Sequence, residues 1–343
     1  MSEFGSPADS ALHEMGRVIH GEGVVTNLDF HREGRWLVMS TNENSIHLID
    51  ALAGEEKKKL YAKANGIGKI KFTHHESCVL LSSEKRYDIR YLCMYDNRYL
   101  RCFEGHTGKV TSLSMSPIDD RFLTASADKS VCLWSVSSPT SSPIAKIKLP
   151  LKCEQPFVSF DESGIVFGVM CLDSITKRHS IKLFDARNYS SGPFQNVTPD
   201  SSLFESALAK VNPSLSSSAI SQKFRDPWTS FDFSTDGNNL LVNTQSDALY
   251  VLDGFNSEVE PIVLNGRKND AGLSLGACFS SNSKQVLTGN EDNQVLIYDT
   301  QSGELQGTLD GHVAPVGCVR YNPKFDEFAT GCVNTVLWIP KDM

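Results

Sequence analysis

A pattern of short strands recurs along most of this 343-residue chain and constrains its fold more than any other feature. Each copy has an alternating apolar strand that ends in an aromatic residue or Met, a second apolar strand after a turn, and a third strand that ends near Asp. Residues 110–136 carry the clearest copy. Repetition of this kind predicts one repeat architecture rather than several unrelated domains.

The residues that end the first strands, which we call anchors, measure the period of the repeat. Successive anchors are separated by 42, 43, 45, 73, 46 and 42 residues. All but one of these steps match the period of about 40–45 residues expected of a four-stranded propeller blade. We therefore expect an all-β fold, with a single seven-bladed β-propeller over residues 11–343. The anchors are Phe30, Phe72, Met115, Phe160, Phe233, Phe279 and Tyr321.

Two segments lie outside the repeat. The long step contains a Ser-rich insertion at residues 198–223, which has no clear strand or helix periodicity and is expected to be a loop. Residues 12–21 precede the first anchor strand and are expected to supply the outer strand that closes the last blade. Residues 1–10 are expected to be a disordered tail or a remnant of an expression vector.

Gly-His pairs precede the units that end in Trp134 and Trp338. In a WD repeat, such a His joins a strand Ser or Thr, a turn Asp and the Trp in a buried chain of hydrogen bonds. We therefore expect a structural role for these residues, because buried polar groups need partners. The expected structural residues are His106, Asp128, Trp134, His312 and Trp338.

The sequence contains no motif for catalysis, a phosphate loop or a metal site. It has no G-x-x-x-x-G-K-S/T, G-x-S-x-G or H-E-x-x-H pattern, and its nine Cys residues include no C-x-x-C pair. We expect no enzyme activity, no cofactor and no metal. The net charge of −8 argues against direct nucleic-acid binding, and the absence of a long apolar run argues against a membrane span.

Segments in nearly every blade carry a more specific likeness, at residues 88–92, 96–101, 103–106, 113–120, 164–167, 185–187, 192–194 and 321–325. These segments resemble a known family, the Swd-two-type WD-repeat subunit. That family is shared by COMPASS-type histone lysine methyltransferase complexes and by phosphatase-containing complexes of RNA cleavage, polyadenylation and transcription termination. The resemblance implies a nuclear, non-catalytic adaptor, monomeric within its complex, that binds a short segment of a methyltransferase or phosphatase scaffold.

A second hypothesis is a substrate receptor of a cullin-type ubiquitin ligase. Residues 184–187 resemble the W-D-x-R ending with which many WD proteins contact the ligase adaptor, with Phe184 in place of Trp. In either role, we expect the partner to bind a propeller face, where loops are held on a rigid scaffold. Counting from the anchors places the candidate partner-binding residues at Lys109, Thr111, Glu154, Trp228, Thr229 and Glu291, with Trp228 as the aromatic anchor of the interface.

Overall fold

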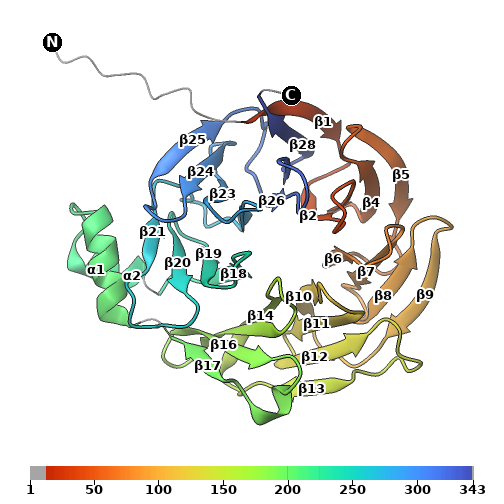
Figure 1. Ribbon diagram of the computed structural model, residues 1–343, viewed down its shortest axis with the longest axis horizontal. Coiled ribbons are helices and arrows are strands. Elements are labelled where there is room, and N and C mark those ends of the chain that lie inside the picture. The colour runs from red at the N-terminus through yellow and green to blue at the C-terminus, as the bar shows by residue number, and fades with distance from the viewer. Residues whose placement is uncertain (1–12, 199, 224, 342–343) are drawn as a thin grey trace.

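The computed structural model describes residues 13–198, 200–223 and 225–341. Seven four-stranded sheets surround a central channel, so the expected all-β, seven-bladed propeller is confirmed (Figure 1). Within every sheet, neighbouring strands run antiparallel. The tail or vector remnant expected at residues 1–10 lies outside the described residues.

Each blade begins with the strand nearest the channel, which we call the inner strand, and ends with an outer strand. Blade 1 contains β2 (Val25–Phe30), β3 (Trp36–Thr41), β4 (Ser45–Asp50) and β5 (Glu55–Tyr61). Blade 2 contains β6 (Ile70–Phe72), β7 (Cys78–Ser82), β8 (Ile89–Cys93) and β9 (Arg98–Phe103). Blade 3 contains β10 (Val110–Met115), β11 (Arg121–Ser126), β12 (Ser130–Ser135) and β13 (Ala145–Lys148).

The remaining blades follow the same order. Blade 4 contains β14 (Cys153–Phe160), β15 (Val166–Asp173), β16 (His179–Asp185) and β17 (Gln195–Val197). Blade 5 contains β18 (Trp228–Phe233), β19 (Asn239–Thr244), β20 (Leu249–Asp253) and β21 (Ile262–Leu264). Blade 6 contains β22 (Ala277–Phe279), β23 (Gln285–Gly289), β24 (Val295–Asp299) and β25 (Leu305–Leu309). Blade 7 contains β26 (Cys318–Tyr321), β27 (Phe328–Gly331), β28 (Asn334–Pro340) and β1 (His13–His20).

All seven anchors are the last residues of inner strands. The inner strands therefore begin at one end of the channel and finish at the other. We call the end where they begin the start face and the opposite end the end face. The start face also carries the turns between the second and third strands of each blade, because neighbouring strands are antiparallel.

The hydrophobic core lies between blades rather than inside any one of them. The described residues form seven apolar clusters, and each cluster joins side chains of two adjacent blades. One cluster packs Leu28 and Phe30 of blade 1 against Ala329 and Leu337 of blade 7. Every blade thus buries both of its faces only when the ring is closed.

The chain closes the ring with strands from its two ends, as expected from residues 12–21. Strand β1 lies beside β28 at the top of the ring (Figure 1), with His13 opposite Pro340 and His20 opposite Asn334. The pairing covers the edge of β28, which would otherwise expose unpaired backbone groups. Leu12 falls outside the described residues.

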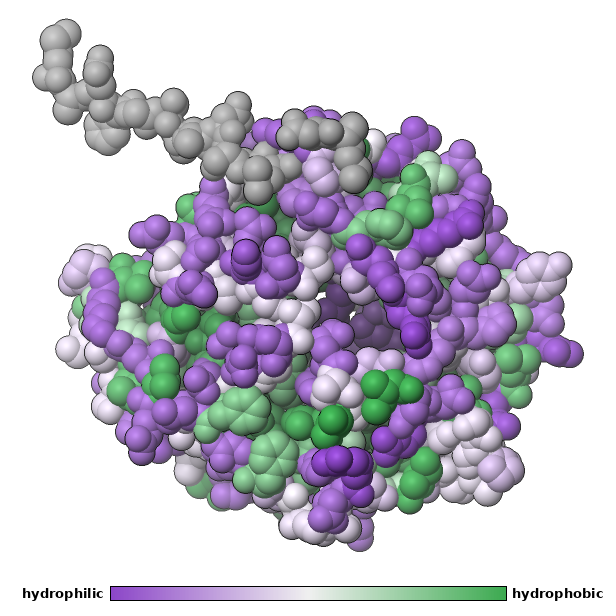
Figure 2. Space-filling view, viewed as in Figure 1, coloured by the Kyte–Doolittle hydropathy of each residue, from purple (hydrophilic) through white to green (hydrophobic). Residues whose placement is uncertain are grey.

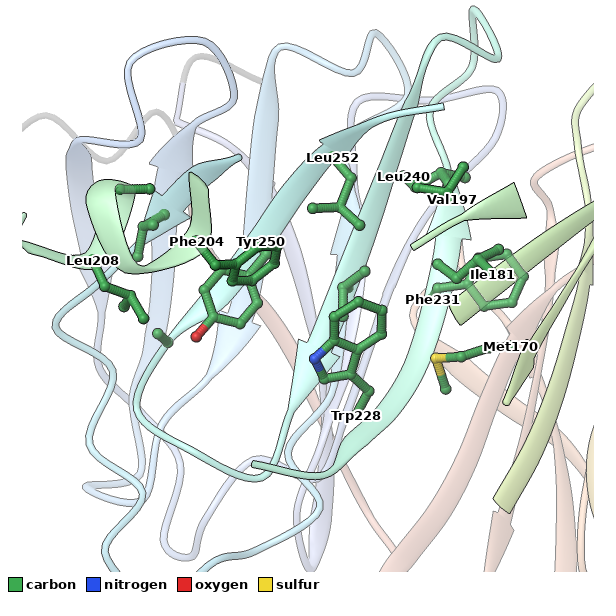
Figure 3. Packing of buried hydrophobic residues seen from close by; sticks show 14 of the residues in the cluster. Met170, Ile181, Val197, Phe204, Leu208, Trp228, Phe231, Leu240, Tyr250 and Leu252 are labelled. Carbon is green, nitrogen blue, oxygen red and sulfur yellow. The ribbon is translucent and has the colours of Figure 1, made fainter. Parts of the chain in front are cut away.

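The expectation of a loop at residues 198–223 is wrong, because two helices form there. Helix α1 (Ser201–Val211) and helix α2 (Ser217–Lys223) lie on the outside of blade 5 (Figure 1). The side chain of Asp200 caps α1 by accepting a hydrogen bond from the Ser202 amide. Phe204, Ala207 and Leu208, spaced three and four residues apart, are buried against the blade (Figure 3).

Candidate functional site

A buried chain of hydrogen bonds joins four side chains in blade 3. Trp134 Nε1 donates to Thr124 Oγ1 at 2.8 Å, and Thr124 Oγ1 lies 2.7 Å from His106 Nε2. His106 Nδ1 is 3.1 Å from an Asp128 carboxylate oxygen. Because a carboxylate can only accept, Nδ1 carries the imidazole proton and Thr124 donates to Nε2. The four side chains of this network therefore have hydrogen-bond partners within the blade, as a structural role requires.

Blade 7 repeats this arrangement without the carboxylate. Thr330 Oγ1 accepts from Trp338 Nε1 at 2.7 Å and lies 2.6 Å from His312 Nε2. His312 Nδ1 faces the Cys332 sulfur at 3.1 Å. With no carboxylate to stabilise its charged form, burial lowers the pKa of His312 to about 4.

Acidification is expected to destabilise the protein through two buried histidines. Burial lowers the pKa of both His179 and His312 to about 4 from the ordinary value of 6.5. The unfolded chain therefore binds protons at a higher pH than the folded chain. The contribution of these histidines to the free energy of unfolding is fully present above pH 6.5 and is lost as the pH falls toward 4. We expect a loss of roughly 2 kcal/mol for each histidine between pH 7 and pH 5.

Urea denaturation at the two pH values measures this loss. His312→Gln should reduce the difference between the two unfolding free energies, whereas His75→Gln, on the surface, should leave the difference unchanged. An equal pH dependence in the wild type and the His312 variant would show that His312 does not carry it.

Trp228 does not lie on the surface of either face, which corrects its prediction as the aromatic anchor of an interface. Its side chain is 3% exposed and stacks on His179 at a ring separation of 4.7 Å. Figure 3 shows it in the core between blades 4 and 5, in the same cluster as Phe204 and Tyr250. Its position at the start of an inner strand places the indole between two blades, so a partner cannot reach it.

The other candidate residues all belong to the start face. Lys109 is exposed, and its ammonium pairs with Glu84 at 2.9 Å. Glu154 is also exposed, whereas Thr111 and Thr229 are half-buried at bulges of their inner strands. The Thr111 hydroxyl donates to the Pro156 carbonyl, and Glu291, in the turn between β23 and β24, accepts a hydrogen bond from the Ala271 amide.

Charged side chains on the inner strands, which sequence reasoning missed, line the channel. Lys71 pairs with Asp29 at 2.5 Å, between blades 2 and 1. Arg320 of blade 7 reaches Asp232 of blade 5 at 2.9 Å. The signal that could have identified them is a charged residue directly before an anchor, because strand alternation turns that residue toward the channel while its neighbours are buried.

The channel widens at the end face into a cavity of about 370 Å³ that every blade lines. Asp161 and Glu162 lie at this end, and burial raises the pKa of Glu162, with the nearby carboxylates of Asp232 and Asp161 acting in the same direction. Hydrophilic side chains predominate over the surface in Figure 2, which also shows a hydrophilic hollow near its centre. The cavity at the end face therefore contains carboxylates together with the cations Arg32, Lys71 and Arg320.

No three His, Cys, Asp or Glu side chains among the described residues are placed to hold a metal ion. No helix in the same ranges is long and apolar enough to cross a membrane. At residues 184–187, Phe184 is buried against Phe167, while exposed Arg187 pairs with its neighbour Asp185 at 2.9 Å.

Comparison with known proteins matches the WD domain, G-beta repeat, at residues 97–135 and 303–339. These segments contain Trp134 and Trp338. WD repeat-containing protein 82 of Drosophila melanogaster is 31% identical over 319 residues, covering 92% of this chain and 90% of the relative.

Two fungal proteins are also similar. The Set1 complex component swd2 of Schizosaccharomyces pombe is 29% identical and covers 84% of this chain and 74% of its own length. The COMPASS component SWD2 of Saccharomyces cerevisiae is 28% identical and covers 90% and 88% respectively. The similarity covers 84–92% of this chain, so this chain belongs to the family of WD repeat-containing protein 82 and Swd2.

Proposed function

We propose that this chain is a non-catalytic adaptor in the nucleus, a subunit of a COMPASS-type histone lysine methyltransferase complex. The similarity along almost the whole chain to proteins named as Set1 complex and COMPASS components is the observation that carries this proposal. In this role the start face holds a short segment of the methyltransferase. A rigid ring suits such binding, because a preorganised surface loses little conformational entropy when a peptide docks.

The start face supports this role through its exposed charges. Lys109 and Glu154 belong to adjacent blades and are accessible, so a peptide that crosses the face can contact both. Exposed charges of this kind contribute to the rate and orientation of association. The buried Trp228 is excluded from this surface, and the binding energy must come from other side chains.

Purification of tagged protein from nuclear extract tests the proposal. We expect a SET-domain methyltransferase to co-purify with the tagged wild-type protein, in a molar amount equal to that of the tagged protein. The start-face variant Lys109→Glu/Glu154→Lys should capture it at least about tenfold less, since like charges then face the segment. Lys284→Glu/Glu304→Lys, a charge-matched pair on exposed positions of blade 6, should behave as the wild type.

The identity of the co-purifying proteins separates the alternatives. Phosphatase and polyadenylation subunits without a methyltransferase would assign the chain to a termination complex. A cullin-ligase adaptor alone would replace the proposal with the ligase role and would make Asp185 and Arg187 the residues to test. Equal capture by both charge-reversal pairs would contradict the placement on the start face.

A further inference from the structure

Lys69 lies in the channel just inside the start face. It directly precedes β6, whose first residue, Ile70, is buried between blades 1 and 2. Strand alternation therefore turns both Lys69 and Lys71 toward the channel, with Lys69 one step of about 7 Å nearer to the start face. Cys318 of β26, two residues before Arg320, lies near Lys69, and its thiol donates to the Val25 carbonyl of blade 1.

The ammonium of Lys69 has no carboxylate partner. Lys71 is paired with Asp29, Arg320 with Asp232, and Lys109 with Glu84. Among the described residues, the Lys69 backbone amide donates to the Ser82 hydroxyl, but no ion pair or hydrogen bond involves the ammonium. The cations that act on this ammonium are Arg320, Lys109 and Lys71. Burial lowers the pKa of Lys69, and the charges of Arg320 and Lys109 lower it further.

The nearby thiol does not supply the missing negative charge. Burial raises the pKa of Cys318 to about 11, so this group is neutral at physiological pH. Lys71 and Arg320 are already paired with Asp29 and Asp232. The other charged groups of the channel, Arg32, Asp161 and Glu162, line the cavity at the end face, and Lys69 does not line that cavity. Lys69 is therefore an unpaired cation at its own level of the channel. An excess cation inside a chain whose net charge is −8 is an unfavourable arrangement unless an anion completes it.

We propose that the start-face half of the channel is a carboxylate-binding site, in which Lys69 receives an Asp or Glu side chain of the partner segment. This inference rests on the proposed function, because it names the chemistry by which the start face recognises its segment. The anion enters from the start face, because Lys69 lies near that end of the channel and does not line the cavity at the end face. A single acidic side chain is sufficient, because Lys69 carries one unpaired positive charge.

Nuclear magnetic resonance of ¹³C-dimethylated lysines tests the site without the partner. The signal of Lys69 is assigned by its loss in Lys69→Arg. The probe is the capped tripeptide acetyl-Ala-Glu-Ala-amide, titrated at low salt, with acetyl-Ala-Gln-Ala-amide as the neutral control. We expect a saturable shift of the Lys69 signal with the Glu peptide alone, whereas the signal of exposed Lys284 should not saturate.

Three results of this titration would overturn the proposal. Equal shifts with the Glu and Gln peptides would show that charge is not recognised. A stronger shift with acetyl-Ala-Gln-Ala bearing a free C-terminal carboxylate would assign the site to a chain terminus instead of a side chain. The absence of a shift would show that the ammonium remains hydrated and binds no carboxylate.

A stability measurement separates a binding role from a structural one. We expect Lys69→Met to raise the Tm of the free protein by about 1–2 °C, because it removes an uncompensated cation from the channel. The same variant should bind the methyltransferase at least about tenfold more weakly. A lowered Tm would mean that Lys69 already has a stabilising partner inside the ring, which contradicts the proposal.

These outcomes distinguish this inference from the proposed function. Normal capture of the methyltransferase by Lys69→Met, together with an unmoved Lys69 signal, would overturn the carboxylate site and leave the adaptor role intact. A saturable Glu-peptide shift in a protein that captures no methyltransferase would leave the site standing and overturn the adaptor role.

Discussion

Replacing Trp134 with alanine is expected to lower the free energy of unfolding by about 4 kcal/mol. The indole is fully buried and stacks on Phe122 at 6.0 Å, with the edge of Phe103 at 5.9 Å. Its loss leaves a cavity between blades 2 and 3, and it also removes the N–H that Thr124 accepts. Urea denaturation followed by circular dichroism measures the change.

Trp36→Ala provides the matched control. This Trp is only partly buried, and its Nε1 donates to the exposed Glu76 carboxylate, so its removal should cost less than about 1 kcal/mol. Trp134→Phe should have an intermediate effect, because it keeps an aromatic ring and loses the hydrogen bond. Equal midpoints for Trp134→Ala and Trp36→Ala would contradict the structural role of the network.

Deleting residues 1–20 is expected to lower the Tm strongly, so that the protein no longer shows a cooperative transition at the wild-type Tm. The deletion removes β1, the outer strand of blade 7, and uncovers the edge of β28. It also removes Ile19, which is buried in the cluster that joins blades 7 and 1. Because each blade depends on two neighbours, an open ring loses stability at both sides of the gap. Differential scanning calorimetry measures the effect.

Restoration by a separate peptide shows whether the missing strand is the cause. A peptide of residues 13–22 added to the truncated protein should restore much of the lost Tm, and a peptide of the same composition in scrambled order should not. A truncated protein that melts cooperatively at the wild-type temperature would show that β1 does not close the ring.

Local sequence patterns were sufficient where the fold repeats. The seven anchors end the seven inner strands as expected, because an alternating strand followed by a turn is a short-range signal. The contacts among His106, Asp128 and Trp134 follow from positions within one repeat. Their partner Thr124 lies in the strand between them, so the geometry of a single blade brings these groups together.

The same reasoning failed where contacts join different blades or depend on an insertion. The serines around α1 made the segment look like a polar loop. Its apolar face is recognisable only in the structure, where Phe204 and Leu208 pack against blade 5. Trp228 occupies the same strand position as the buried Val110, directly before the bulge of its inner strand, and His179 of blade 4 covers it. Neither the helix docking site nor the covering residue can be read from the neighbouring sequence.

The sequence by itself determined the number of blades, the class of fold and the hydrogen-bonded networks of blades 3 and 7, because these depend on periodicity and on spacing within about 40 residues. Only the tertiary structure decided which charges meet in the channel. Asp232 and Arg320 are far apart in the chain and pair across a blade, whereas Lys69 is left without a carboxylate. Ring closure sets these distances, and pairing of charges depends on distance in space rather than along the chain.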